Sequence, residues 1–328
     1  MMLIPPGAMF ALSAEGVRAP DELPDNYAFV ANVSRLVGAA RFALAPGHHL
    51  RRANATEAAE IRAILQRQPS PVITVPWEHS RPVGGPSQPL PEAEWRYFVV
   101  GFRGSNDTVA EIEEVFGLTT FELKIAFTVV TQMIGGRPCS GVLSHPSRLF
   151  QLLEAAVWGR LPFLDITESE VAQIAEILGK LGQHDHSLVD VKRLARQLLD
   201  LEALPPTSPL RFLGYFATLE SLLTHRPNQS DPYDSITRQV KKKLALLDHR
   251  WQPNIDYGPF AGARPDTIWA KMYEYRSSLA HGDAPSFENE FQTLGNHDNA
   301  VTLVRQTVKA VIRQALVEPR LIADLRDC

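Results

Sequence analysis

The sequence predicts an α+β protein, in which a mixed α/β domain over residues 1–140 precedes an all-helical region over residues 141–328. A chain of 328 residues is longer than one ordinary globular core requires, so two domains are expected. Residues 1–140 mix short apolar runs with Pro and Gly, whereas the later residues show long stretches of helical periodicity. The composition, 45% apolar and 21% charged, is typical of a soluble globular protein and gives both parts enough apolar residues for a core.

Both strands and helices are predicted in the N-terminal part. Val72–Val75 and Trp95–Phe102 are rich in β-branched and aromatic residues and predict strands, with a Pro/Gly-rich loop over residues 80–91 between them. Apolar periodicity predicts helices over Ala55–Gln66 and Thr108–Phe116.

Two later segments mark the end of this domain. Phe121–Met133 is almost continuously apolar, so periodicity does not decide between a buried strand and a helix. The Gly-rich segment Gly135–Gly141 lacks the spacing and the lysine of a phosphate-binding loop. We interpret it as the domain linker.

Helical periodicity dominates from His145 onward. The expected helices cover residues 147–158, 168–181, 188–201, 209–225, 233–248, 265–281 and 298–317. Ser208 and Pro209 form a helix start signal, as an N-cap followed by a first-turn proline. Pro319 is expected to stop the last helix.

The residues with the most distinctive chemistry lie at the end of the helix expected over 265–281. Arg276 and His281 stand five positions apart in the segment Tyr273–Gly282. Arginine is permanently charged and its planar fork matches two phosphate oxygens, while histidine exchanges a proton near neutral pH. The pair therefore suits attack on a phosphodiester, although the same two residues also occur by chance as a helix-end cap and an ion pair.

Helix geometry separates this pair. Five residues advance about 7.5 Å and turn through roughly 140°, so one straight helix points the two side chains in different directions. Either the helix unwinds at His281, with Gly282 as a left-handed cap, or the pair is completed across a symmetric dimer. Both alternatives put the imidazole near a helix C-terminus, where the dipole favours its protonated form.

The segment Tyr275–Asp283 resembles the signature of HEPN domains, an arginine and a histidine separated by four to six residues. The Apea-like branch is the most similar, with an upstream helix like Phe212–Leu223, a middle helix like Ser235–Leu247 and then the helix that carries the arginine. The resemblance covers about residues 188–318. It implies a helical bundle that forms homodimers and brings two arginine and histidine pairs into one cleft.

The resemblance also implies metal-independent cleavage of RNA, without a cofactor. Arg276 would stabilise the scissile phosphate, and His281 would transfer a proton as the ribose 2′-hydroxyl attacks. Ser277 is expected to steady the phosphate or the arginine, and Glu220 to orient a basic partner. Tyr275 can stack a base, but its place on the apolar face favours core packing.

The helix over 233–248 carries four basic residues, Arg238, Lys241, Lys242 and Lys243. Such a run is usually a solvated face, which we favour; if the helix borders the cleft, it would instead guide RNA phosphates. The net charge of −4 argues against coating of nucleic acid by bulk charge. His184-Asp185-His186 has no recognisable third metal ligand and predicts a polar loop.

The remaining features predict a cytoplasmic protein. Two widely separated cysteines do not make a disulfide framework, the N-terminus lacks a signal peptide, and no apolar run is long enough to cross a membrane. We expect an endoribonuclease that acts as a toxin or antiviral defence effector, controlled by its N-terminal domain or by an antitoxin or regulatory protein. The alternative is a noncatalytic module for dimerisation or for binding of nucleotide or RNA.

Overall fold

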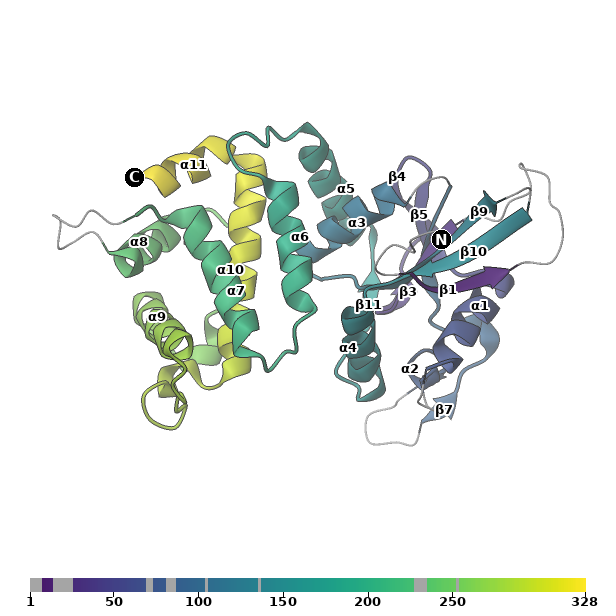
Figure 1. The fold of residues 1–328 in the computed structure, drawn as a ribbon, viewed down its shortest axis with the longest axis horizontal. Coiled ribbons are helices and arrows are strands. Elements are labelled where there is room, and N and C mark those ends of the chain that lie inside the picture. The colour runs from purple at the N-terminus through teal and green to yellow at the C-terminus, as the bar shows by residue number, and fades with distance from the viewer. Residues whose placement is uncertain are drawn as a thin grey trace. The chain divides into compact units, whose positions relative to one another are not determined.

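The computed structural model of the protein describes residues 8–13, 26–68, 73–80, 87–103, 106–134, 137–226, 235–251 and 254–328. The chain divides into two compact units, Met1–Leu178 and Gly179–Cys328. A β-sheet with helices occupies residues 26–166, and an all-helical region follows over 168–327, so the predicted fold class is confirmed (Figure 1).

A seven-stranded sheet forms the centre of the N-terminal unit. In spatial order its strands are β1 (Ala8–Ser13), β10 (Arg137–Leu143), β9 (Ile125–Ile134), β2 (Asn26–Val30), β8 (Phe98–Phe102), β5 (His48–Arg52) and β4 (Arg41–Ala45). Every neighbouring pair is antiparallel. The central strands β2 and β8 are buried along their whole length, as expected for a sheet covered on both faces.

Short strands and helices complete the unit. Outside the large sheet, β3 (Val33–Leu36) pairs in parallel with β11 (Leu164–Ile166), and β6 (His79–Ser80) pairs with β7 (Gln88–Pro89). The helices are α1 (Ala55–Gln66), α2 (Val75–Glu78), α3 (Asp107–Leu118), α4 (Pro146–Val157) and α5 (Glu168–Gln183), which crosses the division between the units.

An aromatic cluster joins α1, α2 and α4 to one face of the sheet. Phe29 lies at its centre, with ring centroids 5.6 Å from Trp77, 5.9 Å from Tyr97 and 5.3 Å from Phe127. The rings of Trp77, Tyr97 and Phe29 are almost completely inaccessible to solvent, so they contribute a large share of the hydrophobic stabilisation.

Several local predictions in this unit need correction. The predicted strand Val72–Val75 is wrong in its described part, because Val75 begins α2; Pro76 fits the first turn of a helix and has no N–H for a sheet. The ambiguous apolar segment is strand β9. The predicted linker is strand β10 in its described part, so the compact unit extends past residue 140 to Leu178.

The C-terminal unit is a bundle of helices. They are α6 (Val191–Glu202), α7 (Pro209–Leu223), α8 (Ile236–Asp248), α9 (Pro265–His281), α10 (His297–Val317) and α11 (Pro319–Asp327). The helix α7 packs against α6, α8, α9, α10 and α11, and in Figure 1 α7 and α10 lie side by side in the middle of this unit. Pro319 ends α10 as predicted but also starts α11, since proline fits the first helical turn.

The burial of α7 and the start and end of α9, the helices that carry the site, follow directly from their sequences. The aromatic face of α7 is buried through Phe212, Tyr215 and Phe216. Pro265 opens α9, and Gly282 closes it with a left-handed φ of 81°. None of the helices in the described parts of the chain is long and apolar enough to span a membrane.

Candidate functional site

Arg276 on α9 contacts Glu220 of α7 on one side and the ring of Tyr273, three residues earlier on α9, on another. Its Nη2 atom is 3.3 Å from Oε2 of Glu220 on α7. The guanidinium carbon lies 6.0 Å from the centroid of the Tyr273 ring, within cation–π range. One third of the Arg276 side chain is exposed, at 34%, so the guanidinium is both positioned and reachable from solvent.

Glu220 is the carboxylate that holds this arginine, and its side chain is only 14% exposed. Burial raises the pKa of Glu220, and the attraction and hydrogen bond of Arg276 oppose that rise without cancelling it. The second oxygen, Oε1, is buried and has no hydrogen-bond partner among the described residues. The predicted link between Glu220 and a basic partner is therefore present.

His281 is the last residue of α9 and is exposed. The N–H of Gly282 donates to the carbonyl oxygen of Leu279 at 3.2 Å, and the N–H of Asp283 donates to that of Ser278 at 3.1 Å. These bonds satisfy carbonyl groups at the helix end, as left-handed glycine caps do. The predicted cap at Gly282 is confirmed.

The helix ends at His281 with the left-handed cap at Gly282, as in the first of the two arrangements considered above, but His281 itself is still the last helical residue. Arg276 and His281 therefore diverge by roughly 140° around one helix, with about 7.5 Å of rise between them. A single chain offers a positioned arginine and an exposed histidine on different sides of α9. Completion of the pair by a second copy stays a prediction.

Tyr275 packs in the core and does not face solvent. Its ring is 2% exposed and contacts the rings of Phe212, Phe287 and Phe291. Its hydroxyl lies 2.7 Å from Nδ1 of His297, and burial raises the pKa of Tyr275 to about 12. The core-packing interpretation is confirmed.

Two neighbours complete this description. Ser277 follows Arg276 on α9 and is partly exposed, and its hydroxyl makes no hydrogen bond with a described residue. The sequence analysis did not predict that His297 contacts Tyr275. The position of His297 at the start of α10 was the signal that could have pointed to this contact.

The predicted basic strip on α8 is smaller than its sequence suggests. Lys243 is buried, at 8% exposure, and its Nζ donates to the carbonyl oxygen of Cys328 at 3.0 Å. The reason is helical phase, because Lys243 lies on the same face as the buried residues Val240 and Leu247. Including Lys243 in a phosphate-guiding strip is therefore wrong.

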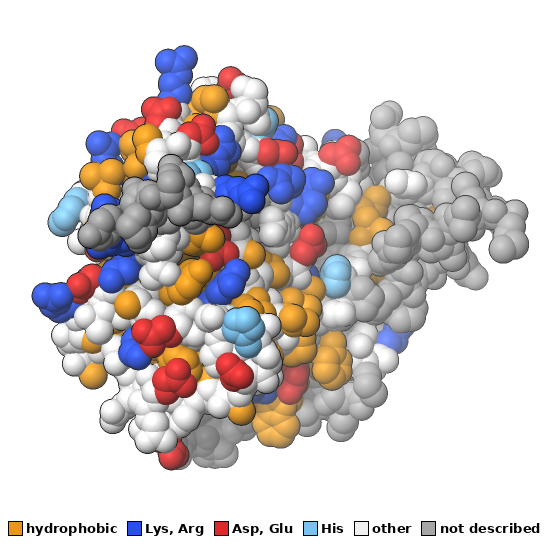
Figure 2. Space-filling model, turned by 60° about the vertical axis from the view of Figure 1, so that its left-hand side comes forward, with side chains coloured by type: hydrophobic (Ala, Val, Ile, Leu, Met, Phe, Trp, Pro, Cys, Tyr) orange, Lys and Arg blue, Asp and Glu red, His pale blue; other side chains and the backbone are white. Residues whose placement is uncertain are grey.

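The other three basic residues of α8 remain at the surface. Arg238 and Lys242 are exposed, and Lys241 is partly exposed. Figure 2 shows Lys and Arg side chains interspersed with Asp and Glu on the face in view, without one continuous basic band. This distribution fits the favoured interpretation of a solvated face.

The histidines at 184 and 186 lie in the loop between α5 and α6, as predicted. Nε2 of His184 donates to the carbonyl oxygen of Val189 at 2.8 Å, which gives this ring a structural role. Within the described residues, no three His, Cys, Asp or Glu side chains are placed to hold a metal ion.

No protein-family model matches the chain, and no curated protein or solved structure is significantly similar to it. Any functional assignment therefore depends on the residues and geometry of the site itself.

Proposed function

We propose that the protein is a metal-independent endoribonuclease of HEPN type that acts as a homodimer. The observation that carries the proposal is Arg276, a partly exposed arginine oriented by the buried carboxylate of Glu220, on a helix whose capped end presents His281. The all-helical unit around α7–α9 is consistent with this family, and the motif supplies the two functional groups that the reaction needs.

In the proposed reaction, the guanidinium of Arg276 binds a non-bridging oxygen of the scissile phosphate and stabilises the charge that develops there. The ribose 2′-hydroxyl loses its proton as it attacks phosphorus, the P–O5′ bond breaks, and O5′ takes up a proton. His281 makes one of these two proton transfers and a water molecule makes the other. The products are a 2′,3′-cyclic phosphate and a 5′-hydroxyl. The nucleophile belongs to the substrate, so no metal-bound water is needed.

A second copy supplies the missing half of the site in this proposal. Because Arg276 and His281 diverge on α9, an arginine from one copy would act with the histidine of the other across a two-fold axis. We place the protein in the cytoplasm, as a toxin or antiviral effector under the control of its N-terminal unit or of a regulatory protein.

The second candidate is a noncatalytic dimerisation or RNA- or nucleotide-binding module. One observation favours it: the Arg276 guanidinium is already paired with Glu220, so its charge is partly neutralised before any phosphate binds. Such a module would tolerate loss of His281 without loss of function.

The test uses purified full-length protein and total RNA in excess chelator, with the fragment ends mapped. We expect cyclic-phosphate and 5′-hydroxyl ends from wild type, none from His281→Ala, and wild-type cleavage from His249→Ala. His249 is a matched control because it is exposed at the end of another helix, α8. Equal cleavage by wild type and His281→Ala would refute the assignment of the site.

Mixing two inactive variants tests whether the site is shared. Arg276→Ala and His281→Ala protomers, allowed to exchange, would form heterodimers with one complete shared site, restoring about a quarter of wild-type activity. If the pair acted within one chain, mixing would restore nothing. Full dimerisation with no cleavage by wild type would favour the noncatalytic module.

A further inference from the structure

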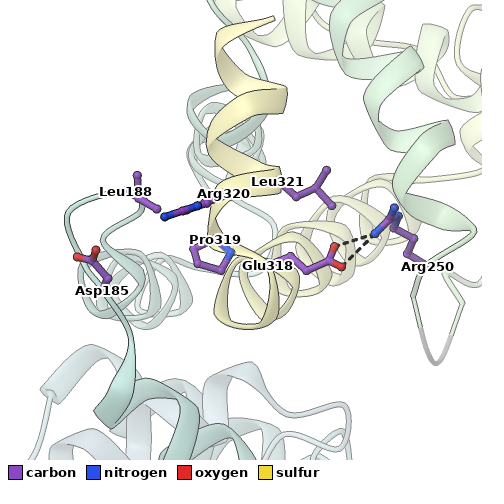
Figure 3. A pocket seen from close by; sticks show the side chains of 7 residues that line it. All are labelled: Asp185, Leu188, Arg250, Glu318, Pro319, Arg320 and Leu321. Atoms are coloured by element: carbon purple, nitrogen blue, oxygen red, sulfur yellow. Dashed lines mark hydrogen bonds and ion pairs between the residues drawn. The ribbon is translucent and has the colours of Figure 1, made fainter.

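A hollow of about 660 Å³ lies within the C-terminal unit, away from Arg276 in sequence and unused by the proposed reaction. Three parts of the chain meet there: the loop between α5 and α6, Arg250 just after α8, and the junction of α10 with α11. Its lining residues are Asp185, Leu188, Arg250, Glu318, Pro319, Arg320 and Leu321 (Figure 3). Small-molecule sites in proteins commonly have volumes in this range.

At one end of the hollow, Arg250 and Glu318 form an ion pair whose opposite charges cancel. Nη1 of Arg250 lies 2.8 Å and 3.1 Å from the two carboxylate oxygens of Glu318, and Gln314 donates to the same carboxylate at 2.9 Å. These bonds satisfy the carboxylate. They occupy only Nη1 of Arg250, so Nε and Nη2 are left as donors for a further acceptor.

Arg320 adds a cation that this pair does not neutralise. Its side chain is exposed, makes no hydrogen bond or ion pair with a described residue, and extends toward Leu188 in Figure 3. Leu188, Pro319 and Leu321 are partly exposed and supply the apolar wall beside it. A guanidinium next to apolar surface suits a ligand that combines an anionic group with an apolar body.

Asp185 provides a different contact elsewhere in the hollow. The backbone N–H of Ser187 donates to its Oδ1 at 2.9 Å, and this hydrogen bonding lowers the pKa of Asp185. Its carboxylate therefore stays ionised at neutral pH and offers an acceptor. A bound anion must carry a donor group, such as a hydroxyl or an ammonium, where it approaches Asp185.

We propose that this hollow binds a small organic anion whose carboxylate or phosphate contacts Arg320. Its apolar body lies against Leu188, Pro319 and Leu321, and a hydroxyl or ammonium group faces Asp185. The hollow is open to solvent, so affinity near the millimolar to micromolar range is expected, between about −4 and −8 kcal/mol of binding free energy. This proposal does not depend on ribonuclease activity.

Isothermal titration of the full-length protein tests the proposal with two probes, AMP for a phosphate ester and leucine for a carboxylate. Saturable binding of one of them identifies the source of the anion. Inorganic phosphate has no apolar body and is expected to bind at least about tenfold more weakly than the better probe.

Two variants locate the binding. Arg320→Gln removes the unpaired charge at the surface and is expected to weaken the better probe about tenfold, the usual effect of losing one charge-assisted hydrogen bond. Arg326→Gln is the matched control, because Arg326 is on the same helix, pairs with Asp327 and is outside the hollow. Equal affinity of wild type and Arg320→Gln, or no binding of either probe at about 10 mM, would overturn the proposal.

Discussion

Substituting Arg276 and substituting Glu220 should change the free energy of unfolding by very different amounts. At 3.3 Å, two unit charges attract by roughly 5 kcal/mol at an effective dielectric constant of about 20. Burial nevertheless leaves the pKa of Glu220 above its ordinary value. The ionised carboxylate is therefore less stable in the folded protein than in water, even with the arginine beside it.

The expected effects of Arg276→Gln and Glu220→Gln on stability follow from this balance. Arg276→Gln leaves a buried carboxylate without this counter-charge, and we expect it to lower the free energy of unfolding by about 2–3 kcal/mol at pH 7 to 8. This is below the usual range for a fully buried pair because one third of Arg276 is exposed to solvent. Glu220→Gln removes the carboxylate that is costly to bury, and its effect should be within about 1 kcal/mol of zero.

The raised pKa of Glu220 determines how folding stability changes with pH. The cost of the ionised carboxylate is absent below the unfolded pKa, near 4.3, and is fully present above the folded pKa. Arg276→Gln raises the folded pKa further. Its stability loss should therefore be smaller at about pH 5 than at pH 7 to 8, because a larger fraction of Glu220 is protonated at the lower pH.

Hydrogen exchange of amides in α7 and α9 measures the stability of this unit separately from the N-terminal one. Far-UV circular dichroism of each variant checks that the helices are retained. A loss for Glu220→Gln as large as that for Arg276→Gln would refute the reasoning. So would an Arg276→Gln loss that is the same at both pH values.

Alanine substitutions at three glycines give further predictions. At Gly214 an added Cβ would lie 2.2 Å from Cδ2 of Leu201, so Gly214→Ala should cost about 1–2 kcal/mol after the gain in helix propensity. In thermal unfolding, Gly179→Ala is the control, with nothing within 4 Å, and should instead stabilise by about 0.5–1 kcal/mol; equal effects would contradict this packing. Gly282→Ala requires alanine at a φ of 81° and should cost about 1 kcal/mol. Faster hydrogen exchange around His281 would reveal the frayed helix end, and unchanged exchange would contradict the capping role.

The helical unit was predictable because its boundaries carry strong local signals. Pro209 and Pro265 fix the first turns of α7 and α9, and Gly282 has the conformation that ends α9. The apolar positions between these residues recur at helical spacing. Local conformation and burial therefore favoured the same structure.

The sheet was harder to predict because its outer strands depend on pairing with neighbours. Strand β5 has the sequence HHLRR, and β10 contains Pro138 and Gly141, so neither shows clear apolar alternation. Their registers with β8 and β9 place them in the sheet. Such long-range pairing has no signal in the segment itself.

Within the site, residue type was easier to predict than environment. The sequence identified Arg276 and His281, but not the burial that sets the charge balance at Glu220. Lys243 was an avoidable error, since its spacing from Val240 and Leu247 already places it on the buried face of α8. Counting charges along a sequence overestimates a basic surface whenever helical phase is ignored.

The environment of Glu220 would couple the proposed phosphate binding at Arg276 to uptake of a proton. A phosphate at Arg276 would add negative charge beside a largely buried carboxylate whose pKa burial already raises, so binding would favour protonated Glu220. If Arg276 binds RNA as proposed, affinity should fall as pH rises through the folded pKa of Glu220. Fluorescence anisotropy with the His281→Ala variant measures binding without cleavage, and adding Glu220→Gln should remove this dependence. A pH dependence that survives Glu220→Gln would show that another group binds the proton.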